Sequence, residues 1–530
     1  MNIGRRSFVA LAGTAFVSTT LFGCTSPSSS SKEQAPADNA TQPDPLVVTT
    51  DKGVVRGALE DGVRVFRGIP FAEPPLGELR FAAPREALAW EGECACLECK
   101  EPPLQLDDGT VIGSEDCLYL NLWAPQDASA KNLPVFVFIH GGGYSQGSPS
   151  KDMHKGTRFA QDGVVQVNIT YRLNGLGFFG SSELEKETGL FGNAGMLDQI
   201  AGLEWVQRNI AQFGGDPDNI TIGGESAGAF SVSTLIASPR AQGLFKRAIL
   251  ESGNLLGQPI VAPAVPGDVE KAESMTASLM ATLKAKNLSD MRALEARDIV
   301  AQSSFSMDVI HPSERYFWPV FDGTTLPENP YKALQQGKMN NVPILAGFNT
   351  DEGSFFVPQG ISEQDYFAYM NDVFGDSATA VLERYPLDAD NTPESRAEHI
   401  FKMGLRLGND LFAEELSRQG TDVYFYNFDY SLQALQDAGF GVGHGLEMPF
   451  IFDSIPNSVQ ITPELKSMKD MIHSYWLNFI KTGNPNGEGL ATWSKYTEAH
   501  KETMRLDVDS NLISSPEQEE VAFYRDLFWA

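Results

Sequence analysis

Residues 219–236 read NITIGGESAGAFSVSTLI. The short apolar run Ile220–Ile222 is typical of a strand that is covered on both faces in a parallel sheet. The residues after Ser226 are first small and then apolar, which suits a helix packed on that sheet. Gly224 and Gly228 leave room for a tight turn and for close approach of the helix to the strand. The stretch therefore predicts a strand and a helix joined by a sharp turn at Ser226.

The rest of the chain repeats this alternation of strand and helix. A helix is expected over residues 200–213, where apolar side chains recur at spacings of 3, 3, 4 and 3, and another over Met468–Ile480. Repetition of strand, helix and strand indicates a doubly wound α/β fold, with a mostly parallel central sheet, helices on both faces and right-handed crossovers. The expected strands are Pro134–Ile139, Val164–Ile169, Ile220–Ile222, Ala248–Leu250, Val342–Ala346 and Val423–Phe428.

The chain of 530 residues is strongly acidic. Its 69 Asp and Glu residues exceed its 40 Lys and Arg residues, which gives a formal net charge of −29. Because phosphate binding needs clustered Lys and Arg, this balance argues against a nucleic-acid partner.

The N-terminal segment is expected to be a targeting signal followed by a flexible tether. Arg5 and Arg6 form a twin-arginine pair, and the apolar run after them is too short to span a membrane. The run ends at Leu-Phe-Gly-Cys24, which resembles the lipobox of bacterial lipoproteins. Residues 1–23 are therefore a predicted twin-arginine and lipoprotein signal peptide, Cys24 a predicted lipidation site, and residues 24–45 a flexible Ser- and Pro-rich tether. We expect an exported protein, attached only by this lipid to the cell surface or the periplasmic side of a bacterial membrane; a plain secretory or uncleaved signal is the alternative.

Four more cysteines allow two interpretations: Cys94, Cys96, Cys99 and Cys117. The Cys-x-Cys-x-x-Cys spacing is compatible with a zinc site, and Cys117 is the residue that could supply the fourth ligand of its tetrahedral set. In an exported protein a disulfide between Cys117 and one of the other three is favoured. No metal is therefore expected.

The pattern Gly-x-Ser-x-Gly occurs twice, at Gly143–Gly147 and at Gly224–Gly228. A serine nucleophile on this motif needs a strand before it and a helix after it, so that the helix N-terminus faces the hydroxyl. Glycine, proline and polar residues follow Ser145, which indicates a loop. Ser226 is therefore the predicted nucleophile.

A glycine run, His140-Gly-Gly-Gly143, directly follows the strand expected at 134–139. Glycines allow backbone N–H groups to point into a shared cavity, as stabilisation of a tetrahedral oxyanion requires. We expect the N–H groups of Gly142, Gly143 and Ala227 to form this oxyanion hole.

A serine hydroxyl needs a base, and His444 is the best placed of the seven histidines. It lies in a glycine-rich loop beyond the strand expected at 423–428, and catalytic groups in open α/β sheets gather at the carboxyl ends of strands. The acid that orients the imidazole should fall between serine and histidine in the sequence. Asp351 and Glu352 both follow the strand expected at 342–346, and spacing does not choose between them.

Six motifs follow one another along the chain: FRGIPFAEPP (66–75), SEDCLYLN (114–121), HGGG (140–143), NAGMLDQ (193–199), FGGDP (213–217) and GESAG (224–228). Together they resemble the type B carboxylesterase family, which includes bacterial para-nitrobenzyl esterases and the cholinesterases. The resemblance covers nearly all of residues 46–530 and implies one α/β-hydrolase domain with large insertions. It also implies that the acid is Glu352, agrees with His444 as the histidine, and makes Cys99 the nearest candidate to pair with Cys117.

The activity that this resemblance implies is hydrolysis of a small-molecule carboxylic ester through an acyl-enzyme, without metal or organic cofactor. Cholinesterases carry a tryptophan shortly before Glu-Asp-Cys, but residues 106–113 contain no aromatic side chain, so a choline ester is not expected. The aromatic residues 316–318 either line an acyl pocket or belong to the core. An adhesion protein of the same fold is the competing class, and the intact set of Ser, Glu, His and glycines argues against it. Acyl transfer, amide cleavage and thioester cleavage use the same machinery and stay open, as do the natural ester and the oligomeric state.

Overall fold

The structure, a computed structural model, describes residues 44–261, 269–304, 306–312 and 315–529. The expected signal peptide, Cys24 and nearly all of the expected tether lie outside these ranges and stay predictions. Within the described ranges, no helix is long and apolar enough to cross a membrane.

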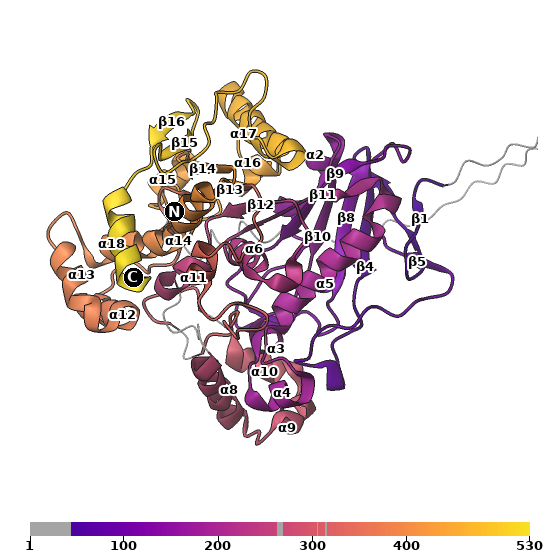
Figure 1. Cartoon of the computed structure of the whole chain (residues 1–530), viewed down its shortest axis with the longest axis horizontal. Coiled ribbons are helices and arrows are strands. Elements are labelled where there is room, and N and C mark those ends of the chain that lie inside the picture. Colours follow the sequence, from indigo (N-terminus) through magenta and orange to yellow (C-terminus); the bar gives the residue numbers. More distant parts are fainter. Residues whose placement is uncertain (1–43, 262–268, 305, 313–314, 530) are drawn as a thin grey trace, which may run out of the picture.

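An 11-stranded sheet runs through the molecule (Figure 1). From edge to edge its strands are β16 (Asn511–Ser514), β15 (Glu502–Leu506), β14 (Val423–Phe428), β13 (Ile344–Asn349), β12 (Arg247–Glu251), β11 (Gly215–Glu225), β9 (Leu133–Ile139), β10 (Val165–Ile169), β8 (Tyr119–Pro125), β4 (Val63–Pro70) and β3 (Ala58–Glu60). Neighbouring strands are parallel from β15 to β10 and antiparallel at both edges. The predicted mostly parallel central sheet is therefore confirmed.

Two smaller sheets lie outside the central one. One contains β1 (Val47–Thr49), β2 (Val54–Arg56) and β5 (Glu93–Ala95), and the other contains β6 (Gln105–Asp107) and β7 (Thr110–Ile112).

The predicted strands are all present, with differences at their ends. The run at 220–222 belongs to a longer strand, because β11 begins at Gly215 and its pairing with β9 shifts register between Gly215 and Ile220. The helix expected at 200–213 begins earlier, as α5 (Ala194–Asn209), and continues as the 3-10 helix η3 (Ile210–Phe213). Propensity and periodicity place these elements well but do not fix their ends.

Helices cover both faces of the sheet, and alternate residues of β9 explain why. Val135 and Val137 face the cluster that includes α5 and α6, whereas Phe136 and Phe138 face the cluster that includes α16 and α17. Figure 1 shows α8, α9 and α10 gathered beside α3 and α4, and α12 and α13 beside α18, as the insertions around the sheet. The helices are α2 (Thr157–Gln161), α3 (Asn174–Phe178), α4 (Ser182–Thr188), α5, α6 (Ala227–Ala237), α7 (Gln258–Val261), α8 (Val269–Leu283), α9 (Leu288–Ala293), α10 (Ala296–Ser303), α11 (Pro330–Gln335), α12 (Glu363–Phe374), α13 (Ala378–Arg384), α14 (Pro393–Arg418), α15 (Gln433–Asp437), α16 (Met448–Ile451), α17 (Pro463–Thr482) and α18 (Gln518–Phe528).

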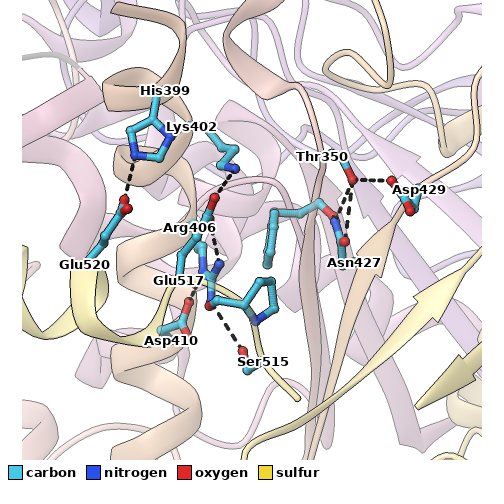
Figure 2. Close-up of polar contacts among 12 residues, drawn as sticks. Thr350, His399, Lys402, Arg406, Asp410, Asn427, Asp429, Ser515, Glu517 and Glu520 are labelled. Carbon is cyan, nitrogen blue, oxygen red and sulfur yellow. Dashed lines mark hydrogen bonds and ion pairs between the residues drawn. The ribbon is translucent and has the colours of Figure 1, made fainter. Parts of the chain in front are cut away.

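Polar contacts join the long helix α14 to the C-terminal segment around α18. Arg406 is fully buried on it, and its guanidinium donates to Asp410 at 2.8 Å and to Glu517 at 2.9 Å. One turn away, Lys402 donates to the other oxygen of Glu517 at 2.6 Å. Figure 2 shows this network, together with the contact between His399 of α14 and Glu520 of α18. Because the buried guanidinium is paired on two sides, its charge is compensated inside the fold.

The expected disulfide between Cys99 and Cys117 is not formed, because the four described cysteines are free. Cys117 is fully buried just before β8, whereas Cys99 is exposed and its Sγ lies 3.9 Å from Asn121 Nδ2. The closest pair of sulfurs is instead Cys94 and Cys96, at 3.9 Å. Cys99 was chosen as the partner of Cys117 by its position in the sequence. In the structure one side chain is exposed and the other is buried, so the two sulfurs are not paired. In the described part of the chain, no group of three or more His, Cys, Asp or Glu residues is arranged to hold a metal ion.

Candidate active site

Ser226 lies on a sharp turn between β11 and α6, as the sequence predicts. Its φ is +57° and its ψ is −126°, a conformation that costs a non-glycine residue about 1–3 kcal/mol and persists only where the surroundings hold it. The turn is held by the Ser226 N–H, which donates to the carbonyl of Glu251 at 2.9 Å. Gly228 is required beside it, because a Cβ there would lie 2.1 Å from the carbonyl oxygen of Ile139. The hydroxyl-bearing residue is thus fixed at the carboxyl end of a central strand.

The glycine run after β9 lies directly against this turn. A Cβ on Gly141 would lie 2.5 Å from the carbonyl oxygen of Glu225 and 3.0 Å from Ser226 Cβ. Gly142 and Gly143 adopt φ of +111° and +61°, which glycine tolerates best. Ala227 is the first residue of α6, where backbone N–H groups have no partner within the helix. Gly141 and Ala227 thus lie next to the nucleophile candidate, and Gly142 and Gly143 follow Gly141 in the chain.

The rejected serine, Ser145, has a different environment. Its side chain is buried, and its hydroxyl donates to Asn174 Oδ1 at 2.8 Å. It lies in a loop, which agrees with the expectation from the sequence.

His444 contacts two glutamates at the carboxyl ends of the strands. Its Nδ1 lies 2.5 Å from Oε2 of Glu352, which is fully buried. Its Nε2 lies 3.0 Å from Oε1 of Glu225, the residue that precedes Ser226. Edge-to-face packing of Phe356 against the imidazole, with ring centroids 5.0 Å apart, holds the ring in this position. The structure therefore brings Glu352 and His444 into contact, and His444 reaches the residue next to Ser226.

The acid comes from the 3-10 helix η6 (Glu352–Phe355), immediately after β13. The second oxygen of Glu352, Oε1, accepts from the Asn349 N–H at 2.7 Å, so both oxygens are engaged. Gly353 lets α14 approach this turn, because a Cβ there would lie 2.3 Å from the carbonyl oxygen of Glu398. The neighbouring Asp351 contacts the loop of His444 rather than its ring. Geometry thus separates two acids that spacing alone could not.

The electrostatics of the site favour a charged imidazole. Burial opposes the imidazolium, but the carboxylates of Glu225 and Glu352 outweigh it and raise the pKa of His444 to about 9. Burial raises the pKa of Glu225, and His444 partly offsets that shift. The two carboxyl groups therefore favour the cationic form of the imidazole.

Two more buried carboxyl groups lie in this region, and sequence reasoning missed both. Glu251 accepts from Trp476 Nε1 at 2.5 Å, and burial raises its pKa. Glu447 accepts from Asn349 Nδ2 at 2.6 Å, and burial together with Glu225 and Glu352 raises its pKa to about 8. For Glu447 a signal was present, since it follows His444 by three residues, whereas nothing in the sequence around Glu251 pointed to the site.

Two other buried histidines, His140 and His473, have structural partners. His140 stacks on Tyr171 with centroids 4.5 Å apart, and burial lowers its pKa to about 4. His473 contacts the carbonyl of Ile451 at 2.7 Å and Asp162 at 3.0 Å. Their environments agree with the choice of His444.

The aromatic residues 316–318 are buried next to the site. Trp318 packs edge-to-face against Tyr144 and Phe230, with centroids 5.0 and 5.2 Å apart. Tyr144 ends the glycine run and Phe230 lies on α6, so Trp318 joins the two elements that flank Ser226. The tryptophan belongs to the core and also supports the wall of the site.

Comparison with known proteins finds similar sequences and structures over nearly the whole described chain. The model of the "Carboxylesterase family" matches residues 44–524. A para-nitrobenzyl esterase from Bacillus subtilis is 34% identical over 499 residues, which is 89% of this chain and 97% of that protein. A fumonisin B1 esterase from Sphingopyxis macrogoltabida is 32% identical over 85% of this chain and 84% of its own length. Among solved structures, a PNB esterase superposes with a TM-score of 0.79 at 32% identity and covers 92% of this chain and 100% of that one.

Proposed function

This chain belongs to the carboxylesterase family and is a carboxylic ester hydrolase, and we propose that it works through an acyl-enzyme on Ser226. The observation that carries the proposal is the 2.5 Å contact between His444 Nδ1 and Glu352 Oε2, on a loop that reaches the turn of Ser226. A base held by an acid beside a serine on a strand-to-helix turn is the arrangement that activates a hydroxyl.

The proposed reaction begins with attack of Ser226 Oγ on the ester carbonyl. His444 Nε2 accepts the hydroxyl proton, and Glu352 at Nδ1 stabilises the imidazolium that forms. The N–H groups of Gly142, Gly143 and Ala227 stabilise the oxyanion, and loss of one such donor typically raises the barrier by about 3–4 kcal/mol. His444 then protonates the departing alcohol, and water repeats the sequence to release the acid.

The small-molecule substrate is proposed to be an uncharged carboxylic ester rather than a choline ester. The stretch that carries the ammonium-binding tryptophan in cholinesterases has no aromatic residue here, between 106 and 113. The reaction requires neither a metal nor an organic cofactor, since the serine, histidine and glutamate supply nucleophile, base and acid.

Chromogenic p-nitrophenyl esters of graded acyl length test this proposal. An ester whose deacylation is slower than its acylation should release a burst of p-nitrophenol of about one equivalent per protein before the steady state, because the acyl-enzyme then accumulates after the phenol has left. Burst amplitude measured by stopped flow against active protein gives the result. Turnover without a covalent acyl-protein, when quenched samples are weighed by mass spectrometry, would contradict it.

The pH dependence of kcat/KM should show the effect of the two neighbouring carboxylates on the pKa of His444. A base must be neutral to accept a proton, so kcat/KM should rise with pH through the histidine pKa near 9. Glu225→Gln removes the negative charge 3.0 Å from Nε2, which lowers that pKa and moves the rising limb down by about one pH unit. Full pH profiles of kcat/KM for both proteins measure the shift.

A matched control for this substitution is Glu251→Gln, at a buried carboxyl group that contacts Trp476 instead of His444. Its rising limb should stay close to that of the natural protein. Coincident limbs for Glu225→Gln and the natural protein would show that the titrating group is not His444.

A further inference from the structure

The loop that carries His444 is fastened to the turn that carries the acid by a set of short contacts. The Asp351 carboxylate accepts from the Val442 N–H at 2.8 Å, and the Asp351 N–H donates to the Val442 carbonyl at 3.0 Å. Ser354 Oγ donates to the carbonyl of Phe440 at 2.8 Å, and Asn349 Nδ2 donates to that of Gly443 at 2.9 Å. The backbone of residues 440–443 therefore follows the surface of residues 349–354.

Two glycines of this loop are required by that approach. Gly441 has φ of +55°, and a Cβ on it would lie 2.2 Å from Asp351 Oδ2. A Cβ on Gly443 would lie 2.2 Å from the ring of Phe355. The ring of Phe355 in turn stacks on Phe440, with centroids 4.7 Å apart. The sequence Gly-Val-Gly-His is thus shaped to lie against Asp351 and Phe355.

Asp351 differs from Glu352 in its surroundings. Glu352 is fully buried and contacts the imidazole of His444. Asp351 is exposed and contacts the backbone of Val442, two residues before the histidine. Asp351 is joined to Val442 twice, through its carboxylate and through its backbone N–H, although it is exposed. The Asp351 carboxylate accepts a hydrogen bond from the backbone of the histidine loop, whereas the side chains of Ser354 and Asn349 donate to it.

We propose that Asp351 is a positioning residue, which sets the place of His444 by fixing the backbone of Val442. The inference rests on the proposed function, because it assigns the two acids of the Asp-Glu pair two different tasks. Glu352 orients the ring and stabilises its charge, and Asp351 holds the loop so that the ring reaches Ser226. Displacement of a catalytic group by about 1 Å can cost a hundredfold in rate, so a contact remote from the ester can matter.

The test compares Asp351→Ala with Asp351→Asn. Alanine removes the acceptor for the Val442 N–H, so kcat for a p-nitrophenyl ester should fall by about tenfold or more with KM nearly unchanged. Asparagine keeps an acceptor oxygen at the same position, so Asp351→Asn should restore most of kcat. The rate of Ser226 phosphonylation by a fluorophosphonate should follow the same order. Because Asp351 is exposed, the thermal unfolding midpoint should change little in either variant.

Asp429→Ala is the matched control, since Asp429 is an acid that accepts from Thr350 Oγ1 at 2.7 Å, beside the same turn (Figure 2). It should leave kcat and the labelling rate near their natural values. Gly441→Ala supplies a second variant, because its methyl group would collide with Asp351 and displace the same loop. If both substitutions displace the same loop, the fold-loss of kcat in the double variant should be smaller than the product of the fold-losses in Asp351→Ala and Gly441→Ala.

Equal kcat and labelling rate for Asp351→Ala and the natural protein would overturn the inference. So would an Asp351→Asn variant as slow as Asp351→Ala, since that would point to charge rather than to the backbone contact. Either result would leave the proposed function intact provided that Ser226 is still labelled. Failure of labelling at Ser226 in the natural protein would instead remove the proposed function.

Discussion

Ser226→Ala should lower kcat for a p-nitrophenyl ester by about a millionfold, to a residual rate that the oxyanion donors alone support. The hydroxyl forms the covalent bond to the acyl group, and no other group on the turn replaces it. The side chain sits at a strained φ of +57° that the backbone contact to Glu251 maintains. Alanine fits the same turn, so circular dichroism and the unfolding midpoint should stay close to those of the natural protein.

The control for this variant is Ser145→Ala, at the serine of the other Gly-x-Ser-x-Gly match. Its hydroxyl donates to Asn174 in the buried loop, so its loss should affect stability by about 1 kcal/mol and kcat far less than Ser226→Ala. Comparable losses of kcat in the two variants would mean that the motif with strand and helix context was chosen wrongly. Steady-state kinetics on both proteins decides between these outcomes.

Glu352→Gln should lower kcat by about ten-thousandfold, with KM much less affected. The carboxylate lies 2.5 Å from His444 Nδ1, where it holds the ring and offsets the positive charge formed when Nε2 accepts the proton. An amide removes the charge and can present N–H groups to the ring, which favours the wrong tautomer. The substitution should also lower the pKa of His444, because Glu352 is one of the charges that raise it.

Asp351→Asn makes the same chemical change one residue earlier and serves as the comparison. The two positions were indistinguishable by spacing, and they should now differ by several orders of magnitude in kcat. A Glu352→Gln variant within tenfold of the natural protein would exclude Glu352 as the orienting acid. Parallel kcat measurements at a pH above 9 keep the base neutral in all three proteins.

Much of the fold could be predicted because it depends on local pattern. The apolar run Val423–Phe428 is β14 to the residue, and the spacing of apolar residues after 200 locates α5. The antiparallel strands β4 and β8 were not predicted. They alternate charged or polar residues such as Arg64 and Asn121 with apolar ones, yet these polar side chains are buried and bonded. A pattern of hydrophobicity cannot anticipate a buried polar group whose partner lies far along the chain.

The sequence alone was enough to propose the nucleophile and the histidine of the candidate site, but not its full charge environment. Gly-x-Ser-x-Gly combines sequence with local structure, so context selected Ser226 over Ser145. The contact of Glu225 with His444 joins residues more than two hundred positions apart, and only the fold brings them together. The pairing of the cysteines could not be predicted for the same reason, because the exposure of Cys99 and the burial of Cys117 follow from tertiary packing.

The central claim is that an ester's acyl group is carried on Ser226, and a fluorophosphonate tests it most directly. The natural protein should be labelled once and lose activity in proportion, and fragmentation of the tryptic peptide 209–240 should place the label on Ser226. Denatured protein and Ser226→Ala should not be labelled. An active esterase that stays unlabelled, or carries the label on another residue, would contradict the account.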